Sequence, residues 1–435
     1  MSIAFEGQLL QQPKHVDSPG QHRSMSSAQA IAAVRPHLRR CGVTRIADIT
    51  GLDRLGVPVT LAVRPNSLTL STSSGKGLTR EAAAISAMME SLELHVAETA
   101  DLPFEETSFE RLARECVVVD VARLPRRKGC AFRADWPELW GSSRDLVSGA
   151  ETKVPYCMLV LRHVASSSGM PGLAGFPVDS NGLASGMTPA EALVSAVYEV
   201  IERDAVTCHT YAYDNGNVPL RRLPPEAIPY EAVRDLMRQI DDGGAKALLY
   251  DCTVDTCIPV FKALIYDRHD TRMPPGGGYG AHLDIEVAMI RALTEASQGR
   301  AVVIAGARDD VFAFDVRRGR ARSTPVPEPL SVDVTPDAAP AFEAGRATAA
   351  FEEDLAVIVD RLRCAGFGQI LVARLPSDLP ITVVKVIVPG LEGYRGHSYV
   401  PGARALRYAG AMRSREEGAP LRQPLYTHLP AGGAR

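Results

Sequence analysis

The stretch SAVYEVIER, residues Ser195–Arg203, contains two acids, Glu199 and Glu202, three residues apart in an otherwise apolar run. At about 100° per residue, Ser195, both glutamates and Arg203 fall on one narrow arc of a helix. The opposite arc is apolar and must be largely buried. This stretch therefore predicts a core helix that presents acids on one stripe.

The same helical pattern occurs three times. Residues 77–93, GLTREAAAISAMMESLE, align without a gap with residues 186–202, GMTPAEALVSAVYEVIE. The matched pairs are Ser86 with Ser195, Glu90 with Glu199, and Glu93 with Glu202. A weaker third copy covers residues 283–300, with Glu295 and Gln298 at the two acidic positions. Thr79, Thr188 and Asp284 precede the three helices and are predicted to cap them.

Two aligned pairs of acids argue against a solvated surface stripe and favour an internal cleft. Two unit charges 4 Å apart repel by about 4 kcal/mol at an effective dielectric of 20, so converging carboxylates need a cation. An all-oxygen ligand set without histidine or thiolate favours Mg²⁺, which completes its shell with water and phosphates. A di-iron carboxylate bundle is the alternative, but it needs Glu-x-x-His on two helices, and the many predicted strands argue against a bundle.

Bulk composition fits a globular chain with a large core. The 435 residues are 46% hydrophobic with a net charge of −3, so nothing indicates nucleic acid as an obligate ligand. The start lacks the apolar region of a secretory signal, and no apolar run approaches the ~20 residues of a membrane span. Eight scattered cysteines suggest free thiols, and we expect a cytoplasmic protein.

Several apolar runs predict strands, which alternate with helices without a strict βαβ rhythm. We therefore expect an α+β fold with mixed, mainly antiparallel sheets. No dinucleotide or P-loop glycine signature is present. Strands are expected within residues 56–73, 154–164, 246–254, 257–267, 369–375 and 381–388. The polar residues 1–25 are expected to be frayed.

The residues quoted so far resemble the YcaO family. The resemblance covers roughly Gly42 to Gly402. It rests on the two S-x-x-x-E-x-x-E helices and on GKG, DSNGLASG, GGYGAHLD, ALTEASQGR and VPGLEGY, in this order. It implies a YcaO-like fold with an N-terminal extension at 1–36, a catalytic domain at 37–405 and a tail at 406–435. The Pro- and Arg-rich segment 316–345 is expected to be a mobile loop within that domain.

The resemblance implies an enzyme that uses ATP and Mg²⁺ to activate a backbone amide of a peptide or protein. A nucleophile adds to the amide carbon, ATP phosphorylates the resulting oxyanion, and phosphate leaves. The implied Mg²⁺ ligands are Glu90, Glu93, Glu199 and Glu202. The implied nucleotide contacts are Lys76, Ser86, Asn181, Ser195, Arg203, Gln298, Arg300 and Arg308, with Arg23 as a looser match for a phosphate contact.

The nucleophile decides the product. Azoline-forming relatives end in Pro-x-Pro-x-Pro, whereas this chain ends LRQPLYTHLPAGGAR. TGLDRLGVPV, GGYGAHLD and VPGLEGY look most like members that form thioamides with an external sulfur donor and a TfuA-like partner. Thioamide formation is therefore the preferred interpretation, with azoline or amidine formation and a non-enzymatic adaptor as alternatives. Members of the family are often homodimers.

Cys208 and His209 follow the second helix. A buried thiol and a helix-end histidine are the simpler interpretation of this pair. If sulfide were relayed through a cysteine, Cys208 would be the first candidate.

Overall fold

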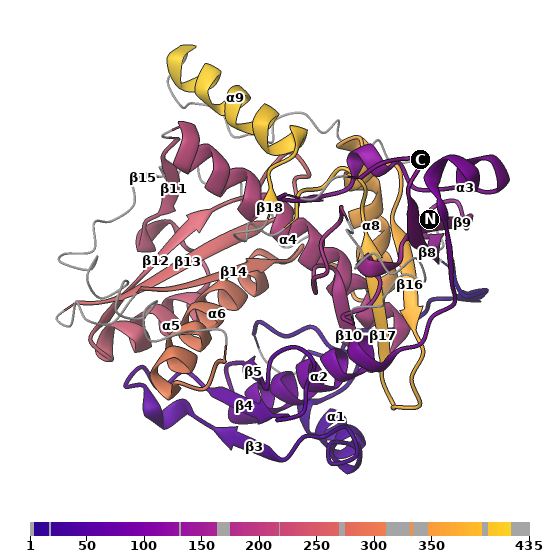
Figure 1. The fold of residues 1–435 in the computed structure, drawn as a ribbon. Helices are drawn as coiled ribbons and strands as arrows, with labels where there is room; N and C mark the ends of the chain where they lie inside the picture. Colours follow the sequence, from indigo (N-terminus) through magenta and orange to yellow (C-terminus); the bar gives the residue numbers. More distant parts are fainter. Residues whose placement is uncertain are drawn as a thin grey trace, which may run out of the picture.

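A computed structural model gives the fold (Figure 1). It describes residues 4–16, 19–129, 132–162, 175–216, 218–268, 275–309, 331–333, 347–393 and 399–418. Helices and sheets alternate in a mixed α+β arrangement, as the sequence predicts. Among the named strands, every pairing is antiparallel except one, between β11 and β15. No helix in the described part of the chain is long and apolar enough to cross a membrane.

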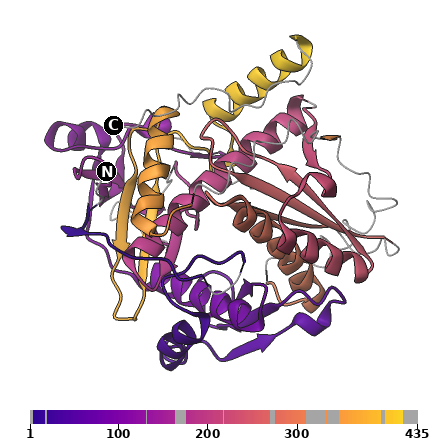
Figure 2. The same ribbon diagram turned by 180° about the vertical axis from the view of Figure 1, so that it is seen from behind.

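Three sheets surround the middle of the molecule (Figures 1 and 2). The first is β3 (Arg45–Asp48), β4 (Val59–Val63) and β5 (Thr72–Lys76). The second runs β10 (Leu183–Gly186), β17 (Thr382–Ile387), β16 (Leu371–Leu375), β8 (Pro137–Asp145) and β6 (Phe104–Ser108), and β9 (Glu151–Pro155) also pairs with β8. The third runs β14 (Gly276–Ala281), β13 (Val260–Asp267), β12 (Ala245–Asp251), β11 (Leu220–Leu223) and β15 (Ser331–Asp333).

Each repeated helix follows a strand at the end of one sheet. The helix α2 (Arg80–Thr99) follows β5, α4 (Pro189–Gly216) follows β10, and α6 (Ile285–Ala305) follows β14. Thr79, Thr188 and Asp284 cap them: their side-chain oxygens accept from Ala82, Glu191 and Glu286 N–H groups at 3.1, 3.3 and 2.9 Å. The structure thus confirms the three predicted caps and adds a strand to each repeat.

Strand and helix of a repeat pack backbone to backbone. A Cβ atom on Gly75 of β5 would lie 2.1 Å from the Ala83 carbonyl oxygen of α2. On Gly280 of β14 it would lie 2.1 Å from the Ala288 carbonyl oxygen of α6. Only glycine permits so close an approach. These contacts fix the depth at which each helix sits against its own strand.

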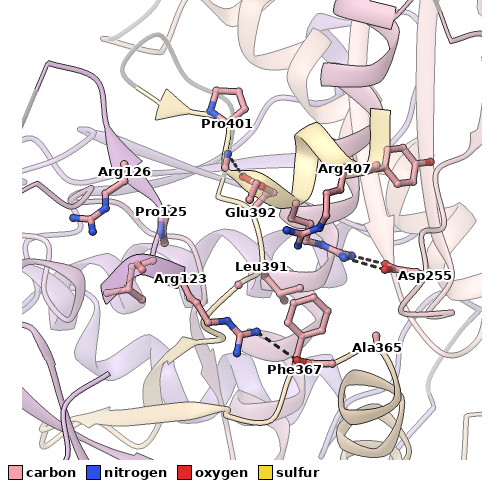
Figure 3. Close-up of a pocket in the computed structure, with 18 of the residues that line it drawn as sticks. Arg123, Pro125, Arg126, Asp255, Ala365, Phe367, Leu391, Glu392, Pro401 and Arg407 are labelled. Carbon is pink, nitrogen blue, oxygen red and sulfur yellow. Dashed lines mark hydrogen bonds and ion pairs between the residues drawn. The ribbon is translucent and has the colours of Figure 1, made fainter. Parts of the chain in front are cut away.

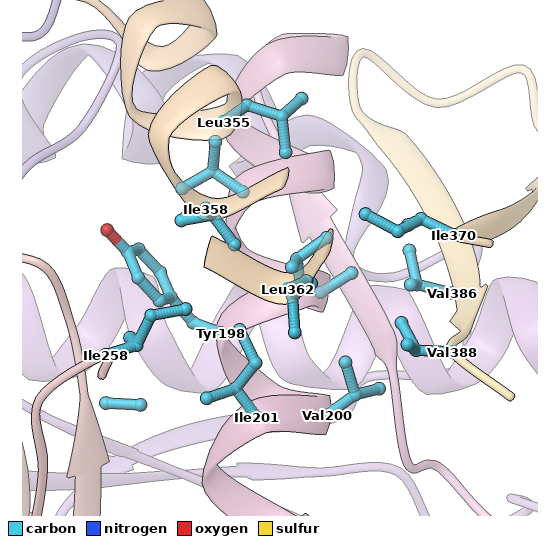
Figure 4. Packing of buried hydrophobic residues seen from close by; sticks show 14 of the residues in the cluster. Tyr198, Val200, Ile201, Ile258, Leu355, Ile358, Leu362, Ile370, Val386 and Val388 are labelled. Atoms are coloured by element: carbon cyan, nitrogen blue, oxygen red, sulfur yellow. The ribbon is translucent and has the colours of Figure 1, made fainter. Parts of the chain in front are cut away.

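A large cluster of buried hydrophobic side chains holds α4 in place (Figure 4). Tyr198 and Ile201 on α4 pack with Ile358 and Leu362 on α8 (Phe351–Cys364), while Val386 of β17 closes the cluster from the sheet. All of these side chains are at most 5% exposed. Burial of the apolar face of α4 therefore fixes the direction in which its acidic stripe points.

The N-terminal segment is packed rather than frayed. Residues 4–16 and 19–26 are described, with a hairpin of β1 (Ala4–Phe5) and β2 (Gln8–Leu9) before α1 (Ser27–Val34). Lys14 Nζ lies 2.5 Å from Asp354 Oδ2, and the Gln12 N–H donates to Glu352 Oε2 at 2.9 Å. Both acids lie in the first turn of α8, so charge on that helix holds the segment against the core.

Other expectations change in detail. The run at 154–164 was expected as a strand, but β9 ends at Pro155, and a short 3₁₀ turn follows at Tyr156–Met158. Proline ends the strand because it lacks the N–H that the ladder requires. The predicted loop 316–345 lies outside the described residues except at β15. The helix α9 (Ala403–Gly418) begins three residues before the predicted tail, 406–435, and includes its first part. The remaining elements are α3 (Phe109–Glu115), α5 (Glu231–Asp242), β7 (Arg126–Arg127) and β18 (Tyr399–Val400).

Candidate functional site

The acidic stripes of the repeated helices meet the strand of the next repeat in a closed ring. Glu93 of α2 accepts hydrogen bonds from the N–H and hydroxyl of Ser185 on β10. Glu202 of α4 accepts from the Ala281 N–H of β14 at 3.0 Å. On α6, Glu295 pairs with Lys76 of β5. The third repeat thereby returns to the first, so all three repeats contribute to one site.

A second set of bonds crosses the α6–β5 junction at Ser74. Gln298 Nε2 donates to the Ser74 carbonyl oxygen at 2.5 Å and lies 2.9 Å from its hydroxyl. The Ser74 N–H donates to Glu90 Oε2 at 2.9 Å. Glu90 and Gln298, from two different helices, therefore meet on one residue of β5.

The predicted carboxylates resist ionisation. Burial raises the pKa of Glu90 to about 7 and that of Glu199 to about 7, although Arg203 opposes the shift at Glu199. Burial and the neighbouring charge of Glu199 raise the pKa of Glu93 well above its usual value. Burial and Glu295 raise that of Glu202. The acids of three helices are thus close enough to repel one another.

Glu295 behaves differently from its neighbours. Burial disfavours its charge, but Lys76 and Arg203 outweigh burial and lower its pKa. Burial and the charge of Glu295 raise the pKa of Glu202, and we assign the charge to Glu295 because Lys76 pairs with it directly. Lys76 thus pairs directly with Glu295, whereas the cation beside Glu199, Arg203, lies 3.8 Å away.

The cations predicted for the site lie around these acids, with two exceptions, Arg300 and Arg23. Lys76 pairs with Glu295, and Arg203 Nε lies 3.8 Å from Glu199 Oε1. The exposed Arg308 contributes to the field at Glu90. Arg300, in contrast, is buried against Asp53 at 2.8 Å and Asp267 at 3.4 Å.

The placement of Arg300 has a geometric reason. It comes five residues after Glu295, and about 100° per residue turns it to another face of α6. Arg23 also lies elsewhere: its guanidinium is 3.4 Å from Glu191, in the first turn of α4. The structure does not bring either arginine to the carboxylates.

The predicted neutral contacts flank the acids. Ser86 and Ser195 are half-buried one turn before Glu90 and Glu199 on their helices. Asn181 lies in the turn before β10, where its N–H donates to Asp179 Oδ1 at 3.1 Å. Its own Oδ1 is buried and makes no hydrogen bond within the described residues. A buried oxygen of this kind needs a hydrogen-bond donor or a cation, which a bound ligand can supply.

Sequence reasoning missed two further cations. Arg291 on α6 favours the charge on both Glu202 and Glu295. Lys385 of β17 acts on Glu199 and Glu93. Lys385 is the single charged residue in the run ITVVKVIV, residues 381–388, and this isolation was the available signal.

The oxygen atoms of these residues are of the type that binds a divalent ion, but they do not form a complete coordination shell. Among the described residues, no three His, Cys, Asp or Glu side chains come together as a ready metal-binding group. The acids nevertheless face one another at raised pKa, and Asn181 Oδ1 is an oxygen without a partner. An oxygen-binding cation would remove this repulsion and supply that partner. Glu90, Glu93, Glu199 and Glu202 are the residues that would hold it.

A cavity of about 630 Å³ is lined by residues from 122–126, 390–392 and α9 (Figure 3). Its wall includes Arg123, Arg407 and Asp255 beside Arg404 and Glu392. None of the predicted site residues lines it. Because its charged walls include the tightly paired Arg404, Asp255 and Glu392, the ring of carboxylates is the better candidate for chemistry.

Cys208 lies on the face of α4 opposite Glu199, near Asp204 and Arg404. Its side chain is fully buried, and burial raises the pKa of its thiol well above the usual value. Burial lowers the pKa of the adjacent His209 to about 4, and its Nε2 lies 2.8 Å from the Tyr408 hydroxyl. An inert thiol and a neutral, hydrogen-bonded histidine fit the simpler interpretation of the pair.

A family model described as "YcaO cyclodehydratase, ATP- and Mg²⁺-binding" matches residues 74–392, which include all three repeated helices. The chain belongs to the YcaO family. This family is ATP- and Mg²⁺-binding, and its members are ATP-dependent enzymes that modify peptide backbones. The YcaO resemblance and the fold expected from the sequence are thereby confirmed.

Relatives and solved structures agree with this YcaO assignment. An uncharacterised protein in the tfuA 3′ region of Rhizobium leguminosarum bv. trifolii is 37% identical over 397 residues, which is 88% of this chain and 92% of that protein. A heterocyclase solved with substrate and cofactor has a TM-score of 0.72 at 20% identity, covering 89% of this chain and 56% of that one.

A third comparison is with YcaO from Methanopyrus kandleri bound to AMPPCP and Mg²⁺. It has a TM-score of 0.67 at 22% identity and covers 89% of this chain and all of that one. At these identities the two solved structures establish the shared fold.

Proposed function

We propose that this YcaO protein uses ATP and Mg²⁺ to phosphorylate the oxygen of a peptide or protein backbone amide and so installs a thioamide. The observation that carries the proposal is the ring of carboxylates built by α2, α4 and α6. Its acids lack sufficient positive charge, which is the condition expected of a site that receives a metal-bound triphosphate.

Each group of residues has a distinct task in this proposal. Glu90, Glu93, Glu199 and Glu202 hold Mg²⁺, which neutralises phosphate charge when bound. Lys76, Arg203, Gln298 and Arg308 lie around them and orient the phosphates, while Ser86, Ser195 and Asn181 supply neutral hydrogen bonds. Phosphoryl transfer depends mainly on such positioning and charge, so no protein nucleophile is needed.

The reaction balances with sulfide as the external nucleophile. Hydrosulfide adds to the amide carbon, and the carbonyl oxygen becomes an oxyanion that attacks the γ-phosphorus of ATP. ADP departs, and the carbon–oxygen bond then breaks to release phosphate. The thiol loses its proton as the carbon–sulfur double bond forms. One ATP is consumed, and one oxygen is replaced by sulfur without a redox change.

The thioamide branch is supported by stretches of sequence and by a relative. TGLDRLGVPV, GGYGAHLD and VPGLEGY resemble YcaO members that form thioamides. The Rhizobium relative lies in a tfuA 3′ region, which supports a TfuA-like partner for this chain as well. The heterocyclase solved with its substrate supports a peptide as the substrate class.

Mass spectrometry tests the product directly. Proteins from cells lacking the gene are incubated with the purified chain, ATP, Mg²⁺, sulfide and a TfuA-like protein, then digested. A peptide heavier by the difference between sulfur and oxygen, dependent on ATP and sulfide, is the expected result. A peptide lighter by one water would assign azoline formation instead. A reaction without ATP turnover and unaffected by Glu199→Gln would contradict the enzymatic proposal.

A further inference from the structure

Lys385 is a buried lysine at the centre of β17. Its side chain is 4% exposed, and its neighbours Val384 and Val386 are fully apolar and buried. The strand lies between β10 and β16, so it is an interior strand of its sheet. An unpaired ammonium in such a place is costly, and lysine is almost never fully buried without partners.

The partners of Lys385 lie on the side of the carboxylate ring. Leu183 pairs with Lys385 and Ser185 with Val383 in the β10–β17 register, so Lys385 shares a sheet face with Ser185. Ser185 is the residue that donates to Glu93. Glu199 and Glu93, from two repeats, both favour the charge on Lys385, although burial lowers its pKa. The lysine therefore supplies positive charge from behind the ring.

The same amine fixes the turn that carries Asn181. Lys385 Nζ donates to the Asp179 carbonyl oxygen at 2.6 Å. At the other end of the turn, the Val386 N–H donates to the Gly182 carbonyl oxygen at 2.8 Å. Gly182 has φ +76°, and a Cβ there would lie 2.2 Å from the Val386 carbonyl oxygen. Two consecutive residues of β17 thus clamp both ends of the turn.

We propose that Lys385 is a positioning residue of the nucleotide site. It holds the Asp179–Gly182 turn, which carries Asn181 and its unpartnered Oδ1, beside the carboxylate ring. This inference rests on the proposed ATP and Mg²⁺ site. A lysine that only supported the fold would not need to fix the turn that carries a predicted nucleotide contact.

The test measures binding of a non-hydrolysable ATP analogue with Mg²⁺ by calorimetry, together with thermal unfolding without ligand. Lys385→Met keeps the aliphatic stem and removes the charge. We expect about 10- to 100-fold weaker binding, the range for groups that support a metal site from behind. Lys246→Met on β12, whose ammonium lies over the Tyr266 ring, is the matched control and should bind like the wild type.

A double-mutant cycle separates positioning from folding. Asn181→Ala should weaken binding in the wild type but add little in the Lys385→Met background, because the turn is already released. Equal losses from Asn181→Ala in both backgrounds, or wild-type affinity in folded Lys385→Met, would overturn the inference.

The Lys385→Arg variant and nucleotide binding by the wild type give two further tests. If the Met variant does not fold, Lys385→Arg replaces it: we expect about tenfold weaker binding, since the guanidinium keeps the charge but displaces the bond to Asp179. Unchanged affinity in Lys385→Arg would contradict the positioning role. A wild-type protein that binds no Mg²⁺-nucleotide would overturn the proposed function itself, and the inference with it.

Discussion

The two faces of α4 bury charge in opposite ways. On one face, Asp204 accepts from Arg404 at 2.7 and 2.8 Å and from the Glu392 N–H at 2.8 Å. Glu392 in turn accepts from Tyr399 and from the Gly402 and Ala405 N–H groups. On the other face, Glu202 accepts from the Ala281 N–H at 3.0 Å, and Glu199 has Arg203 at 3.8 Å.

The difference separates structure from function on a single helix. Burial raises the pKa of Asp204, yet the Arg404 guanidinium and the Glu392 N–H stabilise its charged form. Burial alone would lower the pKa of Arg404, but Asp204 and Asp255 outweigh burial and raise it. The geometry is that of a complete buried ion pair. The ring face instead holds acids whose charge the protein leaves incompletely matched, as a ligand site does.

The largest expected effect on stability is at the face of α4 that carries the Asp204–Arg404 ion pair. Arg404→Met leaves Asp204 buried without its cation, so we expect the free energy of unfolding to fall by about 3–5 kcal/mol in denaturant titrations. Nucleotide affinity of the folded protein should not change. Exposed Arg407, one turn further on α9, is the control, and Arg407→Met should leave stability almost unaltered. A change in affinity without a loss of stability in Arg404→Met would reverse the comparison.

At the ring face, Glu199→Gln should act on binding instead of stability. It removes a proposed Mg²⁺ ligand, so calorimetry with the non-hydrolysable ATP analogue should show at least about 100-fold weaker affinity. The metal-free protein should be no less stable, because a carboxyl with a raised pKa is replaced by a neutral amide. Glu81→Gln, on the exposed first turn of α2, serves as control. Wild-type affinity in Glu199→Gln would remove Glu199 from the site.

The raised pKa values predict a smaller effect of pH on the metal-free protein. Unfolded glutamates lose their protons near pH 4.5, whereas folded Glu90 and Glu199 keep theirs to about 7. The folded state holds more protons in this window, so their contribution to stability is present below pH 4.5 and is lost as the pH rises to about 7.

His209 acts in the opposite direction, because its lowered pKa makes stability fall as the pH drops from 6.5 to about 4. The test therefore compares the wild type with the double variant Glu90→Gln/Glu199→Gln. The free energy of unfolding of the double variant, measured in denaturant, should fall less with rising pH than that of the wild type. Identical pH profiles would mean that the two acids ionise normally.

The smallest effect is expected for Cys208→Ala. Loss of a small, fully buried side chain should cost about 1 kcal/mol of stability. ATP turnover and the modified product should be unchanged, as judged by mass spectrometry of the digested substrate. Loss of product with intact nucleotide binding would instead support a sulfide relay through Cys208.

Local patterns in the sequence were enough to predict the repeated helices. The period of apolar residues and the caps at Thr79, Thr188 and Asp284 depend on neighbours within a few residues, and all three helices form as expected. The strand β14 was not predicted, because its glycines resemble a loop until α6 packs directly on them. Propensity cannot reveal such a tertiary contact.

The site was predictable only where residues share a helix. Glu199, Glu202 and Arg203 follow from one periodic stripe. Arg300 was assigned from the resemblance to YcaO proteins. The helix geometry, at about 100° per residue, already placed it off the stripe of Glu295. Lys385 was missed because strand alternation gives no information about which helices cover a sheet. The closing of the ring across three sheets depends on long-range packing that no local pattern encodes.

The ring also imposes an order on synthesis. Ser74 and Gln298 are 224 positions apart, and their junction is the last of the three to become possible as the chain leaves the ribosome. A nascent chain that stops before β14 can form the Glu93–Ser185 junction, but it lacks both junctions that need the third repeat. The polypeptide should therefore acquire its affinity for nucleotide in a single late step of translation.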